Sequence, residues 1–153
     1  MRMISVKNEI IIDAPLSVVF NIASDVEKYP EFIPTYKKVK IIEQDGERMI
    51  VQREGMAWGK LVNWSSEVWI SPNISIKAIQ LEGPLQGMRI EWQFEEIDDR
   101  TRILLVHNFE YKRIPFIGNL IARFIIARIV SRMAEETLKG IKGMSEKQLT
   151  VGG

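Results

Sequence analysis

The chain has 153 residues, with 21 Lys and Arg against 20 Asp and Glu, so its formal net charge of +1 gives no global attraction for nucleic acid. It contains no cysteine and one histidine, which argues against disulfides, thiolate chemistry and zinc sites. We expect no metal, no cofactor and no nucleic-acid partner. The length suits one domain, which we predict over residues 1–146, followed by a flexible tail over residues 147–153.

The N-terminal region predicts one strand followed by two short helices. Residues 4–12 alternate apolar and polar side chains, which is typical of a half-buried strand. This stretch lacks the unbroken apolar segment of a signal peptide, so we expect a cytoplasmic protein. Asp13 offers an N-cap oxygen and Pro15 suits the first turn of a helix. Pro30 and Pro34 limit the next helix to a turn or two.

The rest of the chain predicts a meander of six strands and then one long helix. Turn signals separate the strands at residues 45–46, 71–73, 83–84 and 98–100. Beyond Pro115 the spacing becomes helical until about Met144, and we expect a frayed end from Ser145. One helix covers a seven-stranded sheet only if the sheet curls around it. We therefore predict an α+β fold, a curved antiparallel sheet around a C-terminal helix, with an apolar pocket between them.

Two blocks of sequence resemble a known superfamily. Residues 25–34 (DVEKYPEFIP) resemble the opening motif of the START-like coenzyme-Q-binding proteins and polyketide cyclases, within the helix-grip (SRPBCC) superfamily. Residues 66–68 and 83–94, with their Gly-Pro turn, Met88, Trp92 and Phe94, are similar to two further strands of that family. The resemblance spans residues 10–141. It implies a helix-grip fold and binding of a hydrophobic molecule such as a polyprenyl quinone, a lipid or a polyketide.

Strand alternation assigns side chains to the inner face of the sheet. Residues 88, 90, 92 and 94 are apolar and alternate with charged or amide residues, so they face the helix. By the same alternation, the odd-numbered residues from 103 to 111 share one face of their strand. The even-numbered residues from 58 to 70, except Lys60, share the inner face of theirs. On the helix, Ala127, Val130 and residues 134, 137 and 141 fall opposite Arg132.

Two interpretations stay open for the aromatic and imidazole side chains on these faces. Trp58, Trp64 and Trp92 suit either a pocket for a flat ligand or ordinary core packing. His107 suits either a general base or a satisfied histidine of the pocket, and no spacing in the sequence pairs it with a carboxylate.

Arg123 is predicted inside the mouth of the pocket because it falls directly opposite Arg132 on the helical projection. A guanidinium keeps its proton, so this group needs a partner. We expect either an internal ion pair with Glu82 or Glu54 or a polar contact with the ligand. The predicted ligand-binding residues are Trp58, Val62, Trp64, Met88, Ile90, Trp92, His107, Phe109, Tyr111, Arg123, Ala127 and Val130.

Residues 114–126 carry more apolar side chains than one helix face can bury. Phe116, Ile117, Ile121, Phe124 and Ile125 spread over much of the helix surface. Exposed apolar area of this size usually has a partner, so we predict peripheral membrane docking or a gate. A contact between two copies of the chain in a homodimer is an equally supported alternative.

We predict that the protein binds or transports a hydrophobic small molecule, a polyprenyl quinone or lipid, without catalytic residues. The alternative is a polyketide aromatase/cyclase-type enzyme, because the resembling enzymes act by orienting a flexible chain. A ribosome-associated interaction module is a third class. The sequence has no serine-nucleophile motif, phosphate loop or dinucleotide fingerprint.

Overall fold

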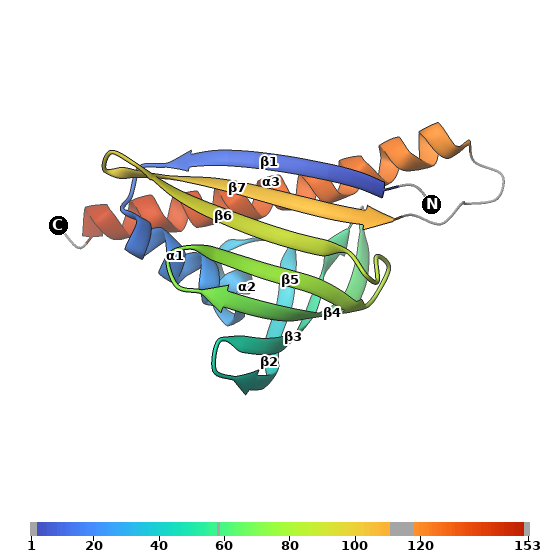
Figure 1. Ribbon diagram of the computed structural model, residues 1–153, viewed down its shortest axis with the longest axis horizontal. Coiled ribbons are helices and arrows are strands. Elements are labelled where there is room, and N and C mark those ends of the chain that lie inside the picture. The colour runs from blue at the N-terminus through green and yellow to red at the C-terminus, as the bar shows by residue number, and fades with distance from the viewer. Residues whose placement is uncertain (1–2, 58, 111–117, 152–153) are drawn as a thin grey trace.

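The computed structural model describes residues 3–57, 59–110 and 118–151. In this part of the chain, seven antiparallel strands form one curved sheet, and a long helix lies across it (Figure 1), so the predicted architecture is confirmed. The elements are β1 Met3–Ile12, α1 Leu16–Ser24, the 3-10 helix η1 Val26–Lys28, α2 Tyr29–Phe32, β2 Tyr36–Asp45, β3 Arg48–Ala57, β4 Lys60–Ser71, β5 Ser75–Glu82, β6 Arg89–Ile97, β7 Arg100–Glu110 and α3 Asn119–Val151.

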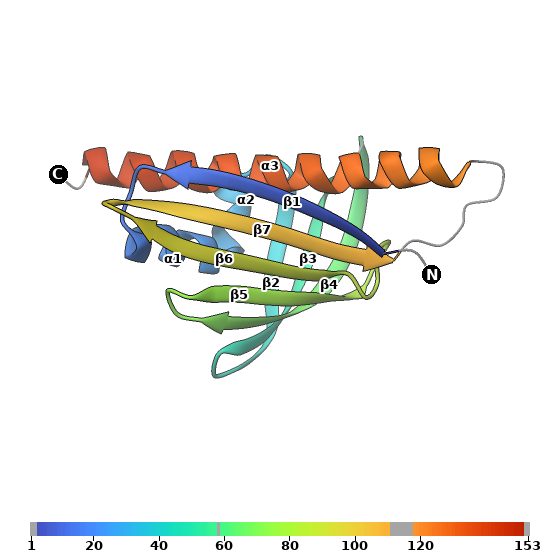
Figure 2. The ribbon, with the colours of Figure 1, turned by 45° about the horizontal axis from the view of Figure 1, so that its top comes forward.

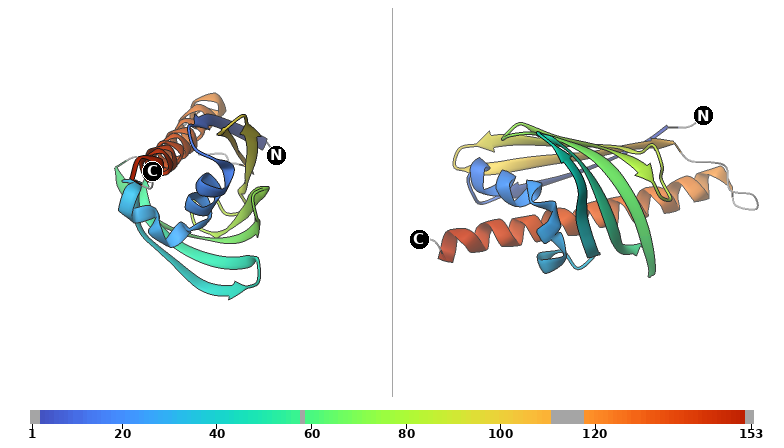
Figure 3. Two further views of the ribbon diagram at one scale, coloured as in Figure 1. Left: turned by 90° about the vertical axis from the view of Figure 1, so that its left-hand side faces the viewer. Right: turned by 90° about the horizontal axis from the view of Figure 1, so that it is seen from below.

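The sheet is a meander that the first strand joins at the far edge. Its order is β1-β7-β6-β5-β4-β3-β2, and β1 pairs with β7 in the register Ile10↔Ile103. The predicted tight turns connect the hairpins, and Gly46 between β2 and β3 adopts a positive φ of 60°. Register shifts in β2 and at Ser65 and Ser66 in β4 mark irregularities that help a sheet to bend. The sheet therefore curls around one side of α3 (Figure 3).

The main core lies where α3 packs against β1 and against the short helices α1 and α2. Ile12, Ile103, Leu138 and Ile141 are almost fully buried there. Gly140 allows the close approach of the short-helix segment, because a Cβ at this position would lie 2.7 Å from Cγ1 of Ile33. A smaller buried cluster lies apart from this core. It consists of Ile4, Val6, Met88, Phe109 and Val130.

Two helix ends differ from the sequence-based predictions. Pro15 is the N-cap of α1, its backbone is extended, and no side chain caps the helix, so Asp13 does not have the predicted role. Helix α3 continues to Val151, and Ser145 is fully buried. The segment from Ser145 was predicted to fray, but it is helical. Residues 147–151, which were predicted to belong to the tail, are helical as well. No proline interrupts these turns, and Lys142 pairs with Glu146 one turn later at 3.0 Å. No helix in the described ranges is long and apolar enough to cross a bilayer.

Candidate ligand-binding cavity

A partly open cavity of about 380 Å³ lies between the inner face of the sheet and helix α3. Volumes of this order are typical of small-molecule sites, which are concave and mainly apolar. Most lining side chains are apolar, and the lining comes from β2 to β7, from the short helices and from α3. The cavity exists because α3 packs chiefly on β1 and the short helices, which leaves space opposite the strands in the middle of the sheet.

Two glycines make room for Trp64 in the wall of the cavity, Gly55 for its indole ring and Gly83 for its Cβ and backbone. A Cβ on Gly55 would lie 3.0 Å from Cη2 of Trp64, and a Cβ on Gly83 would lie 2.7 Å from its Cβ. The Tyr36 ring packs beside this indole, with ring centroids 6.0 Å apart. This wall is therefore an aromatic surface whose position depends on the absence of side chains at residues 55 and 83.

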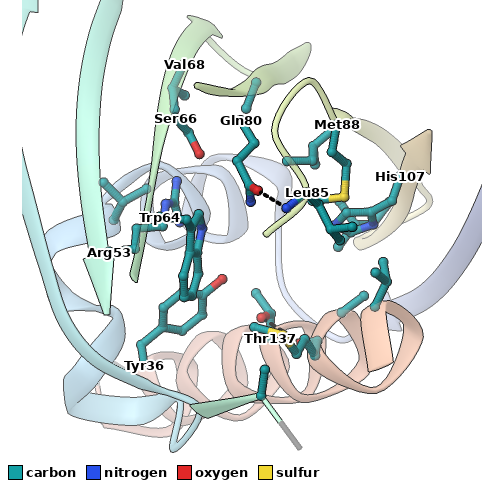
Figure 4. A pocket seen from close by; sticks show the side chains of 18 of the residues that line it. Tyr36, Arg53, Trp64, Ser66, Val68, Gln80, Leu85, Met88, His107 and Thr137 are labelled. Atoms are coloured by element: carbon teal, nitrogen blue, oxygen red, sulfur yellow. Dashed lines mark hydrogen bonds between the residues drawn. The ribbon is translucent and has the colours of Figure 1, made fainter. Parts of the chain in front are cut away.

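Two of the polar side chains in the cavity are occupied by bonds within the fold. Oε1 of Gln80 accepts a 2.7 Å hydrogen bond from the backbone N–H of Leu85, which holds the turn between β5 and β6 (Figure 4). The Thr137 hydroxyl donates a 2.9 Å bond to the carbonyl of Met133 one turn earlier in α3. These two interactions stabilise the walls of the cavity.

Arg53 contributes a positive charge to the cavity and has fewer partners. Its guanidinium lies 5.9 Å from the centroid of the Tyr36 ring, and its Nε is buried without a hydrogen-bond partner among the described residues. Arg53 was not among the residues predicted from the sequence, although its position in the strand indicated an inward side chain. Arg53 shares the inward parity of Met49 and Val51 on β3, both of which are buried.

His107 borders the cavity on the side opposite Arg53 (Figure 4). Burial lowers the pKa of its imidazole to about 4, because the charged form loses its hydration. The ring is therefore neutral near pH 7. Its Nδ1 is buried without a hydrogen-bond partner in the described part of the chain, so it can contact a ligand as a neutral polar group.

Of the twelve predicted residues, seven line the cavity, three described ones do not, and two lie outside the described residues. The seven are Val62, Trp64, Met88, Ile90, Trp92, His107 and Val130. Phe109 is buried in the smaller cluster, and Ala127 is half-buried against the same cluster. Trp58 and Tyr111 lie outside the described residues. Ser66 and Thr137, which were predicted to face inward, also line the cavity, and Tyr36, Arg53 and Gln80 supply polar atoms that were not predicted from the sequence.

The prediction for Arg123 is wrong, because its side chain is exposed and does not line the cavity. Its helical phase does match that of Val130 and Ile141, which are buried. However, the first turns of α3 project beyond the end of β7 (Figure 2), and the inner face of the sheet does not extend there. Whether a residue of α3 faces the sheet therefore depends on its position along the helix axis as well as on its angle around the axis.

The start of α3 exposes large apolar side chains, as expected. Leu120, Ile121 and Phe124 are 77%, 59% and 66% exposed. Ile125 is half-buried. Phe116 and Ile117 lie outside the described residues, as does most of the segment 114–118.

The described residues include no group of three or more His, Asp or Glu side chains that could share a metal ion. The cavity offers a ligand an apolar volume, an aromatic wall, one guanidinium and one neutral imidazole. This set can bind and orient an apolar molecule with a polar end.

Comparison with known families gives one match over most of the chain. Residues 12–137 match the family model described as polyketide cyclase / dehydrase and lipid transport. A Streptomyces halstedii protein with the provisional name polyketide cyclase is 35% identical over 98 residues, which cover 59% of this chain and 86% of that protein. The ribosome association toxin RatA of Vibrio cholerae is 26% identical over 93 residues, which cover 60% of this chain and 65% of that protein.

The fold has a solved counterpart of nearly identical extent. The Zhui aromatase/cyclase from Streptomyces sp. R1128 superposes with a TM-score of 0.91 over 99% of both chains, at 24% sequence identity. At this identity the likeness concerns the fold alone. It is a helix-grip architecture in both molecules.

Proposed function

The chain belongs to the polyketide cyclase / dehydrase and lipid transport family, and from this premise we propose that it binds or carries a hydrophobic small molecule, a polyprenyl quinone or a lipid. The observation that carries the proposal is the cavity of about 380 Å³ with its largely apolar lining. Transfer of an apolar ligand from water into such a volume is favourable in proportion to the area that it buries. The unfilled space between α3 and the middle strands is the binding volume.

Native mass spectrometry of protein purified without detergent tests this function. We expect a co-purified isoprenoid or lipid, or uptake of a short-chain quinone on addition. Ala134 lines the cavity from α3 and is 3% exposed, so Ala134→Phe fills part of the volume. This variant should lose bound ligand.

The matched control is Lys139→Leu, an exposed position on the same helix, which should leave binding unchanged. Thermal unfolding checks that both variants fold. Equal ligand content in the wild type and in a folded Ala134→Phe protein would contradict binding in the cavity.

A second candidate function is a polyketide aromatase/cyclase-type reaction. It is favoured by the 35% identical relative and by two side chains that line the cavity, since Nε of Arg53 and Nδ1 of His107 have no hydrogen-bond partner among the described residues. An enzyme of this kind confines a flexible chain and polarises its carbonyls. Turnover of a polyketide substrate that is lost in His107→Leu, with the fold retained, would support the enzyme, whereas binding without turnover would support the carrier.

A further inference from the structure

Arg53 is the only formally charged side chain among the described residues that line the cavity. Arginine keeps its proton under all ordinary conditions, so it cannot escape the cost of burial by becoming neutral. A buried donor without an acceptor costs about 1–3 kcal/mol, and more when the group is charged. Its Nε has no acceptor within the described ranges.

The nearest acidic candidates do not neutralise this guanidinium. Glu54 and Glu82 border an outer surface depression that Arg53 also lines, and the ion pairs of the described residues include none between either carboxylate and Arg53. Its guanidinium lies over the Tyr36 ring, 5.9 Å from the ring centroid. A ring face weakly attracts a cation but does not accept the hydrogen bond of Nε. The cavity therefore contains an unbalanced positive charge beside an aromatic wall.

We propose that the cavity is specific for monoanionic amphiphiles, in which a carboxylate or an equally ionised oxygen pairs with Arg53 while the apolar body lies against the aromatic and aliphatic lining. Charge-assisted hydrogen bonds are about twice as strong as neutral ones, so an anion gains more here than an alcohol or an ester. This inference rests on the proposed binding function and adds the chemical class of the ligand.

The test compares decanoate with 1-decanol, which share an apolar chain and differ in charge, by isothermal titration. We expect the wild type to bind decanoate at least about tenfold more tightly than the alcohol. Arg53→Met should lose this preference and retain its affinity for the alcohol. Arg89→Met removes an exposed arginine from the outer side of β6 and should retain the preference.

The possible results distinguish a failure of the proposed ligand class from a failure of the proposed binding function. Binding of both ligands without preference in the wild type, or a preference that persists in a folded Arg53→Met protein, would overturn the role of Arg53 and leave the binding function intact. Binding of neither ligand would overturn both proposals. If thermal unfolding shows that Arg53→Met does not fold, Arg53→Gln keeps a polar side chain of smaller volume and replaces it in the same comparison.

A separate observation concerns the start of α3. The exposed apolar residues Leu120, Ile121 and Phe124 are interspersed with the exposed arginines 123, 128 and 132. Residues 119–134 contain no Asp or Glu, and the described structure records no ion pair for these arginines. We call these six exposed residues, which lie between positions 120 and 132, the basic apolar tip.

We infer that the basic apolar tip docks on membranes that contain anionic phospholipids. Apolar side chains enter the interface while arginines contact lipid phosphates, and each basic residue near such a surface contributes about 1 kcal/mol. A symmetric dimer through the same face is disfavoured, because it would bring arginines 123, 128 and 132 of two copies together, and Glu136 is the only acidic side chain among the described residues that line the depression beside Arg128 and Arg132.

Flotation with vesicles tests this surface. We expect the wild type to float with vesicles of phosphatidylcholine and phosphatidylglycerol, to remain soluble with phosphatidylcholine alone, and to dissociate at high salt. Phe124→Ser should reduce the bound fraction several-fold. Leu149→Ser, at an apolar position 42% exposed near the other end of α3, should not. Wild type that stays soluble with both vesicles, or a dimer that Phe124→Ser dissociates, would overturn the inference.

Discussion

His107 shows how burial alone sets the charge of a side chain in this cavity. The imidazole pKa falls from 6.5 to about 4, and desolvation is the cause, with no charged neighbour contributing. The unfolded chain therefore takes up a proton below about pH 6.5, which the folded chain resists until about pH 4. The stability that follows from the neutral ring is present above pH 6.5 and is lost as the pH falls.

The pH dependence of unfolding measures this effect. Between pH 7 and pH 4.5, the difference in pKa costs the wild type about 2.5 kcal/mol of unfolding free energy from this residue. His107→Gln removes this titrating group. The unfolding free energy of the variant should therefore fall by about 2.5 kcal/mol less than that of the wild type between pH 7 and pH 4.5. Denaturant unfolding at the two pH values gives the comparison. Parallel losses in both proteins would contradict the assignment.

Gly83 illustrates a position where only glycine fits. Its φ of +123° is unfavourable for any side chain, and a Cβ would lie 2.7 Å from Cβ of Trp64. We expect Gly83→Ala to lower the unfolding free energy by about 2–3 kcal/mol and to change Trp fluorescence. Gly46→Ala is the control, since Gly46 has a positive φ but no atom within 4 Å. It should cost about 1 kcal/mol, and equal effects would show that strain, not the clash, dominates.

At the scale of elements, helix α3 supplies much of the core through one of its faces. Val130, Ala134, Leu138 and Ile141 recur at intervals of three and four residues, and all are buried. The helix thereby joins the edge strand β1 to the short helices, so its contacts stabilise the fold around the cavity.

Paired truncations on α3 separate packing from helix propensity. Leu138 is 2% exposed, and Leu138→Ala should lower the unfolding free energy by about 2–5 kcal/mol, because it removes buried methyl groups and leaves a void. Leu149→Ala makes the same chemical change at a position 42% exposed, and its effect should stay within about 0.5 kcal/mol. Denaturant midpoints give both values. Similar losses would mean that the last turns of α3 contribute to the core as much as its middle.

For the whole molecule, a ligand in the cavity fills the space between the helix and the sheet. A ligand that binds only the folded state adds about 2.7 kcal/mol at a concentration one hundred times its dissociation constant. For a chain of this length, each kcal/mol raises Tm by about 2–4 °C. We expect decanoate to raise the Tm of the wild type by several degrees and that of Ala134→Phe by little. An equal rise in both would place the ligand outside the cavity.

The sequence by itself determined the order of the elements and the faces of the strands. Alternation with a period of two put Trp92 and Val62 on the inner face of the sheet, where both line the cavity. The turn signals at Gly46 and Gly83 placed the hairpins correctly, because those conformations need glycine. These features are local, so a short window of sequence contains the information that fixes them.

Only the tertiary structure decided which polar groups face the cavity and how far the sheet extends along α3. Arg53 has the parity of an inner residue, but its role depends on the distance to the Tyr36 ring and on the absence of a described carboxylate partner. Arg123 has the correct helical phase and is exposed, because the first turns of α3 project beyond the end of β7. Such properties depend on elements that are distant in sequence and close in space, and periodicity within one element does not contain that information.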